Sequence, residues 1–208
     1  TPIPRTLAII IYGDLDISVI NQLPKGRKPV STYAVTGKMR QRAFGFVKKA
    51  VDAGRQAYVV CPMIEDSESD LLAVKSYAER ASKEFLKGYS IGLLHGKMNA
   101  AEKEKVMRSF KNGDIQVLIC TTVVEVGVDV PNAAIMVIEN AERFGLSQLH
   151  QLRGRIGRGE YKSSCILISD SRSADTKKRL NVIKNSCDGF EIADEDFKLR
   201  GPGDFLGN

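Results

Sequence analysis

Apolar residues follow two alternating patterns over most of the chain. After Gly37 they recur three and four residues apart, which predicts an amphipathic helix that stops near Gly54 and carries Ala43, Phe46, Val47, Ala50 and Val51 on one face. An apolar run at 57–61 then predicts a short buried strand. The same order repeats with a helix over 71–85 and a strand over 91–94.

A third helix is expected between Asn99 and Gly113. Asn99 and Glu102 form a capping-box pattern, and glycine commonly follows the last residue of a helix. Apolar runs at 115–120, 133–138 and 165–169 predict further strands. Strands that alternate with helices in this way indicate right-handed crossovers and a mainly parallel sheet with both faces covered. The pattern therefore predicts an α/β fold.

Composition narrows the class of protein. The chain has 208 residues, enough for one large domain or for one domain with an appendage. Apolar residues make up 43% and charged residues 27%, a mixture typical of a folded globular protein. The longest apolar runs, at 7–12 and 133–138, are far shorter than the about 18 residues that span a bilayer, which excludes a membrane-spanning protein.

The cysteines and the start of the chain bear on its origin. Cys61, Cys120, Cys165 and Cys187 are 59, 45 and 22 residues apart, so no pair has the spacing of a zinc or redox motif, and we expect reduced thiols. The chain starts without a methionine or a secretory segment, so we expect a cytoplasmic fragment of a longer protein. Residues 1–28 fit the alternation poorly and are expected to belong to a neighbouring domain and a linker.

Charge is unevenly distributed along the chain. The whole chain carries +6, and residues 188–208 carry six acids against two bases, which leaves +10 on the first 187 residues. A basic body of this kind favours a polyanionic partner such as nucleic acid. The acidic C-terminal piece is electrically distinct and is expected to form a separate unit.

Three common ligand motifs fail on inspection. The stretch from Gly92 to Lys97 is one residue short of a P-loop and is not followed by the Ser or Thr that holds magnesium. The glycines at 154, 157 and 159 reverse the order of the dinucleotide fingerprint. The acidic run at 65–70 lacks the spacing of a calcium loop and is expected to be a solvated loop or helix start. The chain therefore shows no complete nucleotide site of its own.

The strongest local signal is the arginine-rich segment at 151–158, Gln-Leu-Arg-Gly-Arg-Ile-Gly-Arg. On a helix, Arg155 and Arg158 project from one face, and Gly154 and Gly157 form a bare strip that another backbone can approach. Two glycines cost a helix about 1 kcal/mol each, so a close contact or a functional demand is implied. One interpretation is a surface helix with solvated arginines, and the other is a pair of guanidinium groups that binds phosphate.

A second segment, at 121–134, directly follows a predicted strand. It is expected at the carboxyl end of the sheet, where open α/β folds bind ligands. Thr121 and Thr122 can donate hydrogen bonds to phosphate, Gly127 permits close approach, and Asp129 can accept a hydrogen bond from a ribose hydroxyl. The alternative is an ordinary connection between a strand and a loop.

Together these segments resemble a known family. The stretch Thr-Thr-Val-Val-Glu-Val-Gly-Val-Asp at 121–129 and the arginine-rich segment, which begins 22 residues later, resemble motifs V and VI of superfamily-two helicases, and 94–96 resembles the motif before them. Residues 1–6 resemble the end of motif III, and 12–16, 23–29 and 57–69 resemble the RecG family of branched-DNA helicases. Residues 189–193 and 200–207 resemble the translocation motif that RecG shares with the coupling factor Mfd, and Pro202 favours RecG. The resemblance covers nearly the whole chain.

This resemblance implies the second RecA-like motor lobe of a RecG-type ATP-dependent DNA helicase, a three-layer α/β/α fold with a short C-terminal helical hairpin. It assigns the end of a first lobe and a linker to 1–28, the second lobe to 29–186 and the start of a truncated translocation motif to 187–208. ATP and Mg²⁺ would be bound mainly by the absent first lobe, so we expect the chain alone to be inactive. Branched or forked DNA is the expected partner.

The resemblance also assigns roles to residues. Arg155 and Arg158 are the expected catalytic residues, which neutralise transition-state charge on the γ-phosphate. The other roles are nucleotide contacts from Gly127, Asp129 and Gln151, DNA-backbone contacts from His95, Gly96, Thr121 and Thr122, and coupling of lobe closure to DNA movement by Glu191, Asp196 and Arg200. No metal ligand is assigned within the chain.

Several alternatives stay open at this point. His95 and His150 could each be a satisfied structural histidine, and 194–196 could be a solvated acidic face. Within the same class, the alternative is an Mfd-like translocase, which would couple to RNA polymerase through a further domain upstream. The alternative from another class is a non-enzymatic nucleic-acid-binding module in which the arginine-rich segment grips backbone phosphate.

Overall fold

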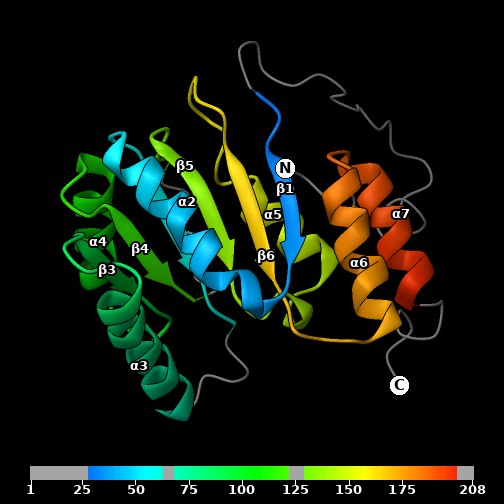
Figure 1. Ribbon diagram of the computed structural model, residues 1–208, viewed down its shortest axis with the longest axis horizontal. Helices are drawn as coiled ribbons and strands as arrows, with labels where there is room; N and C mark the ends of the chain where they lie inside the picture. Colours follow the sequence, from blue (N-terminus) through cyan, green and yellow to red (C-terminus); the bar gives the residue numbers. More distant parts are fainter. Residues whose placement is uncertain (1–27, 63–67, 122–128, 201–208) are drawn as a thin grey trace.

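A single sheet forms the centre of the molecule. The computed structural model describes residues 28–62, 68–121 and 129–200. In this part, six parallel strands are ordered β1-β6-β5-β2-β4-β3 (Figure 1). The strands are β1 (Ser31–Val35), β2 (Gln56–Val60), β3 (Ile91–Leu94), β4 (Val117–Cys120), β5 (Ala133–Ile138) and β6 (Ser164–Ile168). Because the strands are parallel, their carboxyl ends lie along one edge of the sheet.

Helices cover both faces of this sheet (Figure 1). One face carries α2 (Arg40–Asp52) and α3 (Glu68–Glu84), and the other side carries α4 (Ala100–Asn112), α5 (Leu146–Arg153), α6 (Ala174–Asn185) and α7 (Gly189–Arg200). Two short 3₁₀ turns, η1 (Gly37–Met39) and η2 (Ala141–Arg143), follow β1 and β5. The arrangement confirms the predicted three-layer α/β/α class, with a sheet that is parallel throughout the described residues.

Two apolar layers, one on each side of the sheet, form the core. Successive residues of a strand point to opposite faces, so Val59 and Ile119 pack toward α2 and α3, whereas Tyr58 and Leu118 pack toward the other helices. The Tyr58 ring meets the Phe110 ring of α4 edge to face, with centroids 4.9 Å apart. Full burial of a side chain of this size contributes about 1.5–3 kcal/mol, so these layers dominate the stability of the fold.

Most predicted elements are present with small shifts at their ends. The helix predicted to stop near Gly54 is α2, and the strands predicted at 91–94 and 133–138 are β3 and β5. The Asn99 side chain accepts a hydrogen bond from the Glu102 backbone N–H at 2.9 Å, which confirms the predicted start of α4. Gly113 ends α4 with a φ of 89°, a left-handed conformation that glycine adopts without a steric penalty.

The apolar pattern did not predict two of the elements. β1 exposes Tyr33 and alternates in burial, so it offers no continuous apolar run. α6 is rich in charge and buries only Thr176, Leu180 and Ile183, a stripe too narrow to signal a helix. Residues 186–188 join α6 to α7, and these two helices lie side by side (Figure 1). The hairpin predicted within 187–208 stays a prediction, because α7 is its only described helix and 201–208 lie outside the described residues. The predicted domain boundaries stay predictions.

Candidate functional site

The arginine-rich segment leaves its helix earlier than predicted. α5 ends at Arg153, and the following residues form a loop. Gly157 in this loop has a φ of 72°, and a Cβ atom there would lie 2.6 Å from Cγ2 of Val30. The prediction that Arg155 and Arg158 share a helix face is therefore wrong, because a left-handed residue does not continue a right-handed helix. A close approach does occur at Gly157, but it comes from the Val30 side chain and not from another backbone as predicted.

The structure brings Arg158 and Asp129 together beside this loop, which also carries Arg155. Arg158 donates through Nε to the Gly154 carbonyl oxygen at 3.2 Å, and its Nη1 lies 3.4 Å from the Asp129 carboxylate. Burial raises the pKa of Tyr58, and the positive charges of Arg155 and Arg158 oppose that rise. The Arg158 and Asp129 side chains are 32% and 54% exposed, which leaves both accessible to a ligand.

Thr121 and Asp129 lie at different ends of the sheet. Thr121 directly follows β4, at the carboxyl edge as predicted, whereas Asp129 stands four residues before β5. Near the start of β5, the Asn132 carbonyl oxygen accepts a hydrogen bond from the N–H of Gln56, the first residue of β2, at 3.1 Å. The prediction of one site for the whole segment 121–134 at the carboxyl edge is therefore wrong, because residues 129–132 lead into the amino end of β5.

Four side chains form a row at the carboxyl edge, which we call the carboxyl row. The strand registers place His95, Thr121, Cys61 and Glu139 in line across β3, β4, β2 and β5. Backbone hydrogen bonds continue along this line; the Thr121 N–H, for example, donates to the Leu94 carbonyl oxygen at 3.1 Å. The row thus joins two of the predicted DNA contacts to two residues for which no role was predicted.

Two side chains of the carboxyl row carry buried polar atoms without a hydrogen-bond partner among the described residues. These atoms are Nδ1 of His95 and Oγ1 of Thr121. Leaving such a group unpaired costs about 1–3 kcal/mol, so a ligand that satisfied both would be bound favourably. Burial and then Lys75 lower the pKa of His95, with Lys103 adding to the effect and Glu102 opposing it. The imidazole is therefore neutral at pH 7.

Of the remaining residues predicted to contact DNA or nucleotide, the structure describes only some. Gly96 lies in the turn after β3, next to His95, as a joint role requires. Gln151 is exposed on α5, two residues before its end. Thr122 and Gly127 lie outside the described residues.

Sequence reasoning missed a buried carboxylate in the carboxyl row. Glu139 is 3% exposed and accepts hydrogen bonds from Nε and Nη2 of Arg40 at 2.9 and 3.0 Å and from the Tyr77 hydroxyl at 2.9 Å. Its hydrogen bond raises the pKa of Arg40, and burial raises the pKa of Tyr77. Burial also raises the pKa of Cys61 to about 12, so that thiol is uncharged. The sequence feature that could have identified Glu139 is its position as a single acid directly after the apolar run at 133–138.

A buried arginine at the end of α5 was also missed. Arg153 is 4% exposed and donates from Nη1 to the carbonyl oxygens of Ile183 at 2.6 Å and Ser186 at 2.8 Å. Its Nη2 lies 3.0 Å from Nδ1 of the buried His150, so the structural alternative holds for that histidine. The sequence signal is weak, because three arginines stand between residues 153 and 158 and nothing local distinguishes them.

The predicted coupling residues lie on α7, which packs against α5. The Glu191 carboxylate accepts a hydrogen bond from the Ser186 hydroxyl, whose residue also offers its carbonyl oxygen to Arg153. Asp196 accepts from the Ser147 hydroxyl of α5 at 3.2 Å. Arg200 ends α7, and its side chain lies outside the described residues. Glu191 and Asp196 thus connect α7 to the helix that precedes the arginine loop.

Neither metal-binding nor membrane-spanning features occur in the part of the chain that the structure describes. No group of three or more His, Cys, Asp or Glu residues is placed to hold a metal ion there. Asp194 and Glu195 instead pair with Lys198 at 2.7 and 2.9 Å on the exposed side of α7, as the alternative of a solvated acidic face predicts. None of the helices in the described ranges has the length and apolar character needed to cross a membrane.

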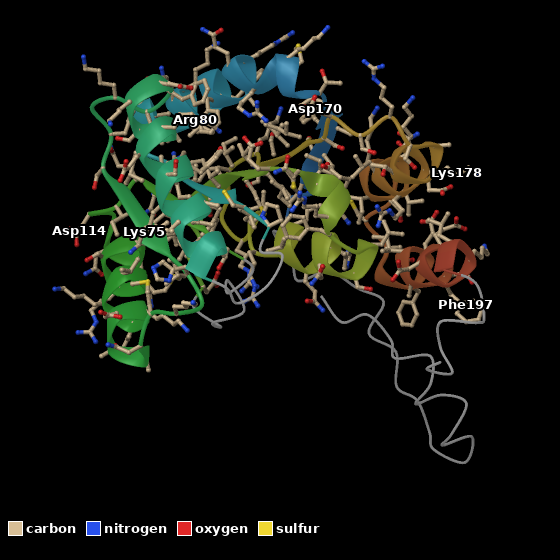
Figure 2. All side chains as sticks on the ribbon, turned by 90° about the horizontal axis from the view of Figure 1, so that it is seen from below. Lys75, Arg80, Asp114, Asp170, Lys178 and Phe197 are labelled. Carbon is tan, nitrogen blue, oxygen red and sulfur yellow. The ribbon has the colours of Figure 1, made fainter. Side chains whose placement is uncertain are left out.

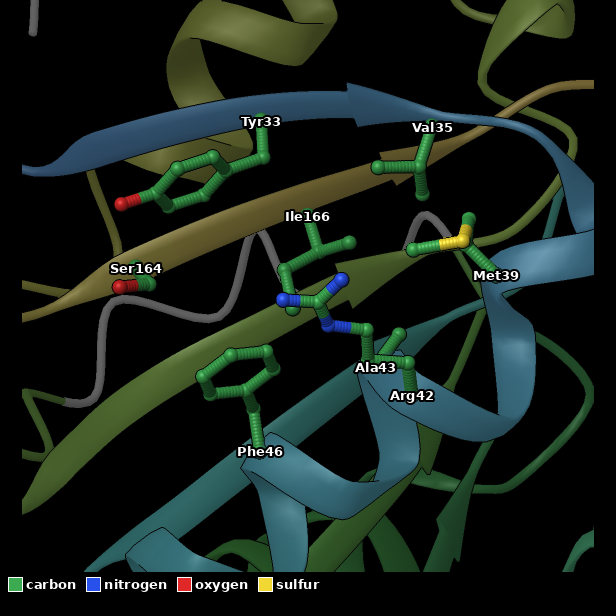
Figure 3. Close-up of a pocket in the computed structure, with 8 residues that line it drawn as sticks. All are labelled: Tyr33, Val35, Met39, Arg42, Ala43, Phe46, Ser164 and Ile166. Atoms are coloured by element: carbon green, nitrogen blue, oxygen red, sulfur yellow. The ribbon is translucent and has the colours of Figure 1, made fainter.

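An apolar groove of about 330 Å³ lies apart from both clusters, between α2 and the sheet edge formed by β1 and β6 (Figure 3). Tyr33 and Phe46 flank it, and Arg42 and Ile166 also line it. None of the predicted site residues lines this groove, so we do not assign it to the candidate site.

Comparisons with known proteins agree on one family. A family model for the helicase conserved C-terminal domain matches residues 42–160. Over its whole length the chain is 52% identical to the ATP-dependent DNA helicase RecG of Bacillus subtilis and 51% identical to that of Escherichia coli O157:H7. It covers 30% of each relative, so the chain spans less than a third of their length.

Solved structures show the same likeness. A structure of RecG bound to a three-way DNA junction matches with a TM-score of 0.83 and 44% identity, over 99% of this chain and 27% of that chain. Domain 2 of the DEAD-box helicase Mss116p, bound to an RNA duplex, matches with a TM-score of 0.57 over 76% of this chain and 61% of that chain. At 18% identity, the second match shows the fold alone. Together with the sequence relatives, the first match confirms the resemblance to RecG-type helicases.

Proposed function

The chain belongs to the helicase conserved C-terminal domain family, and from this premise we propose that it is the second motor lobe of an ATP-dependent helicase that remodels branched DNA. Its similarity to RecG over the whole chain supports the proposal. Because the chain covers 30% of those relatives, the activity is proposed for a longer protein of which this lobe is one part.

One observation carries the proposal: the part-exposed Arg155 and the exposed Arg158 stand in the loop directly after α5, whose last residue, Arg153, is buried and bonded within the protein. Within the described ranges, the partners of Arg158 are one carbonyl oxygen and the Asp129 carboxylate at 3.4 Å, which leaves further N–H donors for a ligand. Guanidinium is permanently charged and matches the geometry of phosphate oxygens. Arg155 and Arg158 would neutralise the charge that develops on the transferred phosphoryl group, and Asp129 would accept a hydrogen bond from the nucleotide sugar.

Magnesium is not assigned to this lobe. The described residues contain no group of three ligands for it, so we derive no step through the metal here. Magnesium bound to the phosphates of ATP would neutralise developing charge in the intact enzyme.

The carboxyl row supports the proposed DNA contact. Nδ1 of His95 and Oγ1 of Thr121 have no hydrogen-bond partner among the described residues and would bind a backbone phosphate once exposed, and Gly96 beside them would permit close approach. Phosphate contacts carry no sequence information, which suits a motor that must step along any DNA. The +10 charge of residues 1–187 favours the same partner.

Coupling between hydrolysis and movement is proposed for α7. Displacement of the arginine loop would reach α7 through α5, because Ser147 holds Asp196 and Arg153 shares Ser186 with Glu191. We therefore expect Arg200→Ala, at the end of α7, to spare ATP hydrolysis and to abolish unwinding of forked DNA in the intact protein.

ATP hydrolysis and fork unwinding by the intact protein test the proposal. We expect forked DNA to stimulate hydrolysis, and the 208-residue chain alone to show no turnover because it has no complete P-loop. DNA binding without hydrolysis by the intact protein would favour the binding module. Activity that depends on RNA polymerase would favour the Mfd-like translocase.

A further inference from the structure

Arg55 and Tyr161 meet at the amino ends of the strands, and the proposed function uses neither side chain. Arg55 stands in the turn between α2 and β2, and Tyr161 follows Arg158 by three residues, before β6 begins. The guanidinium carbon of Arg55 lies over the Tyr161 ring, 3.0 Å from its centroid, which makes a close cation–π contact. This contact ties the turn before β2 to the end of the loop that carries Arg158.

The same guanidinium group also reaches the segment that carries Asp129. Asn132, which stands three residues after Asp129 and directly before β5, accepts a hydrogen bond on Oδ1 from Nη1 of Arg55 at 3.2 Å. Its Nδ2 donates to the Gly54 carbonyl oxygen at 2.9 Å. Arg55 therefore contacts one segment through Asn132 and the other through Tyr161.

The arginine loop, residues 154–163, passes close to the segment of Asp129. A Cβ atom at Gly159 would lie 2.5 Å from the Pro131 carbonyl oxygen, so only glycine allows the two backbones to approach this far. Gly159 directly follows Arg158, and Pro131 stands two residues after Asp129. The backbone beside each of these two charged side chains is thus held against the other.

The ion pair between Arg158 and Asp129 is too weak to fix this arrangement by itself. Nη1 of Arg158 lies 3.4 Å from the Asp129 carboxylate, and exposed ion pairs contribute little to stability. Tyr161 is 45% exposed, so its ring is not part of the apolar core. The contact between Arg55 and Tyr161 is therefore placed to orient the loop rather than to fill the interior.

We propose that Arg55 and Tyr161 are positioning residues for the arginine loop. Their contact holds Arg158 at the separation from Asp129 at which the guanidinium meets the phosphates and the carboxylate meets the sugar of one nucleotide. This inference rests on the proposed function and adds two residues that act on the nucleotide through Arg158. Misplacement of a reacting group by about 1 Å can lower a rate by about 10²-fold, so loss of the contact should be visible in turnover.

The test is steady-state ATP hydrolysis by the intact protein at saturating forked DNA. Tyr161→Leu removes the ring and Arg55→Gln removes the cation, and we expect each to lower kcat by about 10-fold to 10²-fold. KM for ATP should change by less than about twofold, because Arg158 acts mainly on transition-state charge. Tyr161→Phe keeps the ring and should keep the original kcat.

The double variant Arg55→Gln, Tyr161→Leu tests whether the two side chains act as a unit. Its kcat should be no lower than that of the more impaired single variant, because both substitutions remove the same contact. Effects that multiply in the double variant would show two independent roles and would overturn the proposal.

Tyr33→Leu and Arg80→Gln are the matched controls. Tyr33 is 51% exposed on β1, and Arg80 on α3 (Figure 2) lies over the Tyr77 ring at 5.6 Å, so each resembles one member of the pair on an element outside the arginine loop. Neither control should change kcat or KM. Losses in the controls as large as those in the test variants would overturn the proposal, because they would show an effect of any exposed tyrosine or arginine.

Two further results would contradict a positioning role. Unchanged kcat in both Tyr161→Leu and Arg55→Gln would show that the contact does not orient Arg158. A rise in KM for ATP as large as the fall in kcat would show that the Tyr161 ring binds the nucleotide directly. If one single variant does not fold, the other decides on the same criteria, because each removes the same contact.

The outcome separates this inference from the proposed function. If the unaltered protein hydrolyses ATP and Arg158→Ala does not, but neither Tyr161→Leu nor Arg55→Gln lowers kcat, the inference fails and the function stands. If the unaltered protein shows no hydrolysis with forked DNA, the proposed function fails and the inference fails with it.

Discussion

Arg153 and Arg158 stand five residues apart and meet opposite surroundings. Arg153 is buried and places Nη1 on two carbonyl oxygens and Nη2 against His150. Arg158 is part-exposed, with one carbonyl oxygen at 3.2 Å and an exposed carboxylate at 3.4 Å. Buried partners hold both terminal nitrogens of the first guanidinium, whereas the second is part-exposed.

This difference shows how identical side chains acquire different roles. α5 directs Arg153 against the junction of α6 and α7, where a buried charge must find acceptors. The chain then leaves the helix, and the left-handed Gly157 redirects the arginines on either side of it. Exposed ion pairs contribute little to stability, so Arg158 can exchange its partner for a ligand at small cost.

The largest effect that would sharpen this comparison is expected from Arg158→Ala in the intact protein. We expect kcat for ATP to fall by about 10³ or more, the scale of an arginine that meets transition-state charge. Arg155→Ala should do similar damage. Steady-state hydrolysis at saturating forked DNA measures both effects.

Arg158→Lys separates charge from geometry, because lysine keeps the charge and loses the bidentate donors. Its turnover should lie between those of the original protein and Arg158→Ala. Normal hydrolysis with lost DNA affinity in Arg158→Ala would instead identify the loop as a DNA grip and favour the binding module.

On the structural side, Arg153→Met should destabilise the fold by about 2–4 kcal/mol, because two buried carbonyl groups lose their donor. Urea unfolding of the chain measures the loss. The thiol of Cys165 provides a second readout, since burial raises its pKa to about 12 and it reacts at pH 8 chiefly when the fold opens. Its labelling rate should rise by the same factor as the unfolding constant. An unchanged free energy of unfolding in Arg153→Met would show that Arg153 has no structural role that distinguishes it from Arg158.

A smaller loss is expected from Ser147→Ala, which removes the half-buried hydrogen bond from α5 to Asp196. We expect a decrease of about 1 kcal/mol in the free energy of unfolding. Gln151→Ala on the exposed side of the same helix is the control, and it should stay within about 0.5 kcal/mol. Equal losses from the two substitutions would show that the Asp196 contact does not hold α7 in place.

The smallest effect is expected from Asp129→Asn, which removes the carboxylate near Arg158. The free energy of unfolding should change by less than about 0.5 kcal/mol, and added salt should abolish the difference. Thermal unfolding at two salt concentrations checks this. A loss above about 1 kcal/mol would mean that Arg158 is held for structural reasons, and the comparison with Arg153 would no longer hold.

Local sequence was sufficient for the order of most strands and helices, with β1 and α6 as exceptions, and for the family. The start of α4 follows from Asn99 and Glu102, which are three residues apart, and the buried strands follow from short apolar runs. These features depend on residues that are close in the chain, so they can be predicted from the sequence. The helix predicted through Arg158 failed because the φ of Gly157 depends on space taken by Val30, which belongs to another segment.

Contacts between distant residues decided what each charged side chain does. Arg40 meets Glu139 across 99 positions, and Arg153 meets the Ile183 carbonyl across 30, and neither pairing leaves a local pattern. The carboxyl row likewise exists only because strand order and register align four strand ends. Charge and hydrogen-bonding capacity are properties of a residue type, whereas burial and bonding partners depend on how remote segments pack. Burial and partners are what separate the structural Arg153 from Arg155 and Arg158, which we propose bind a ligand.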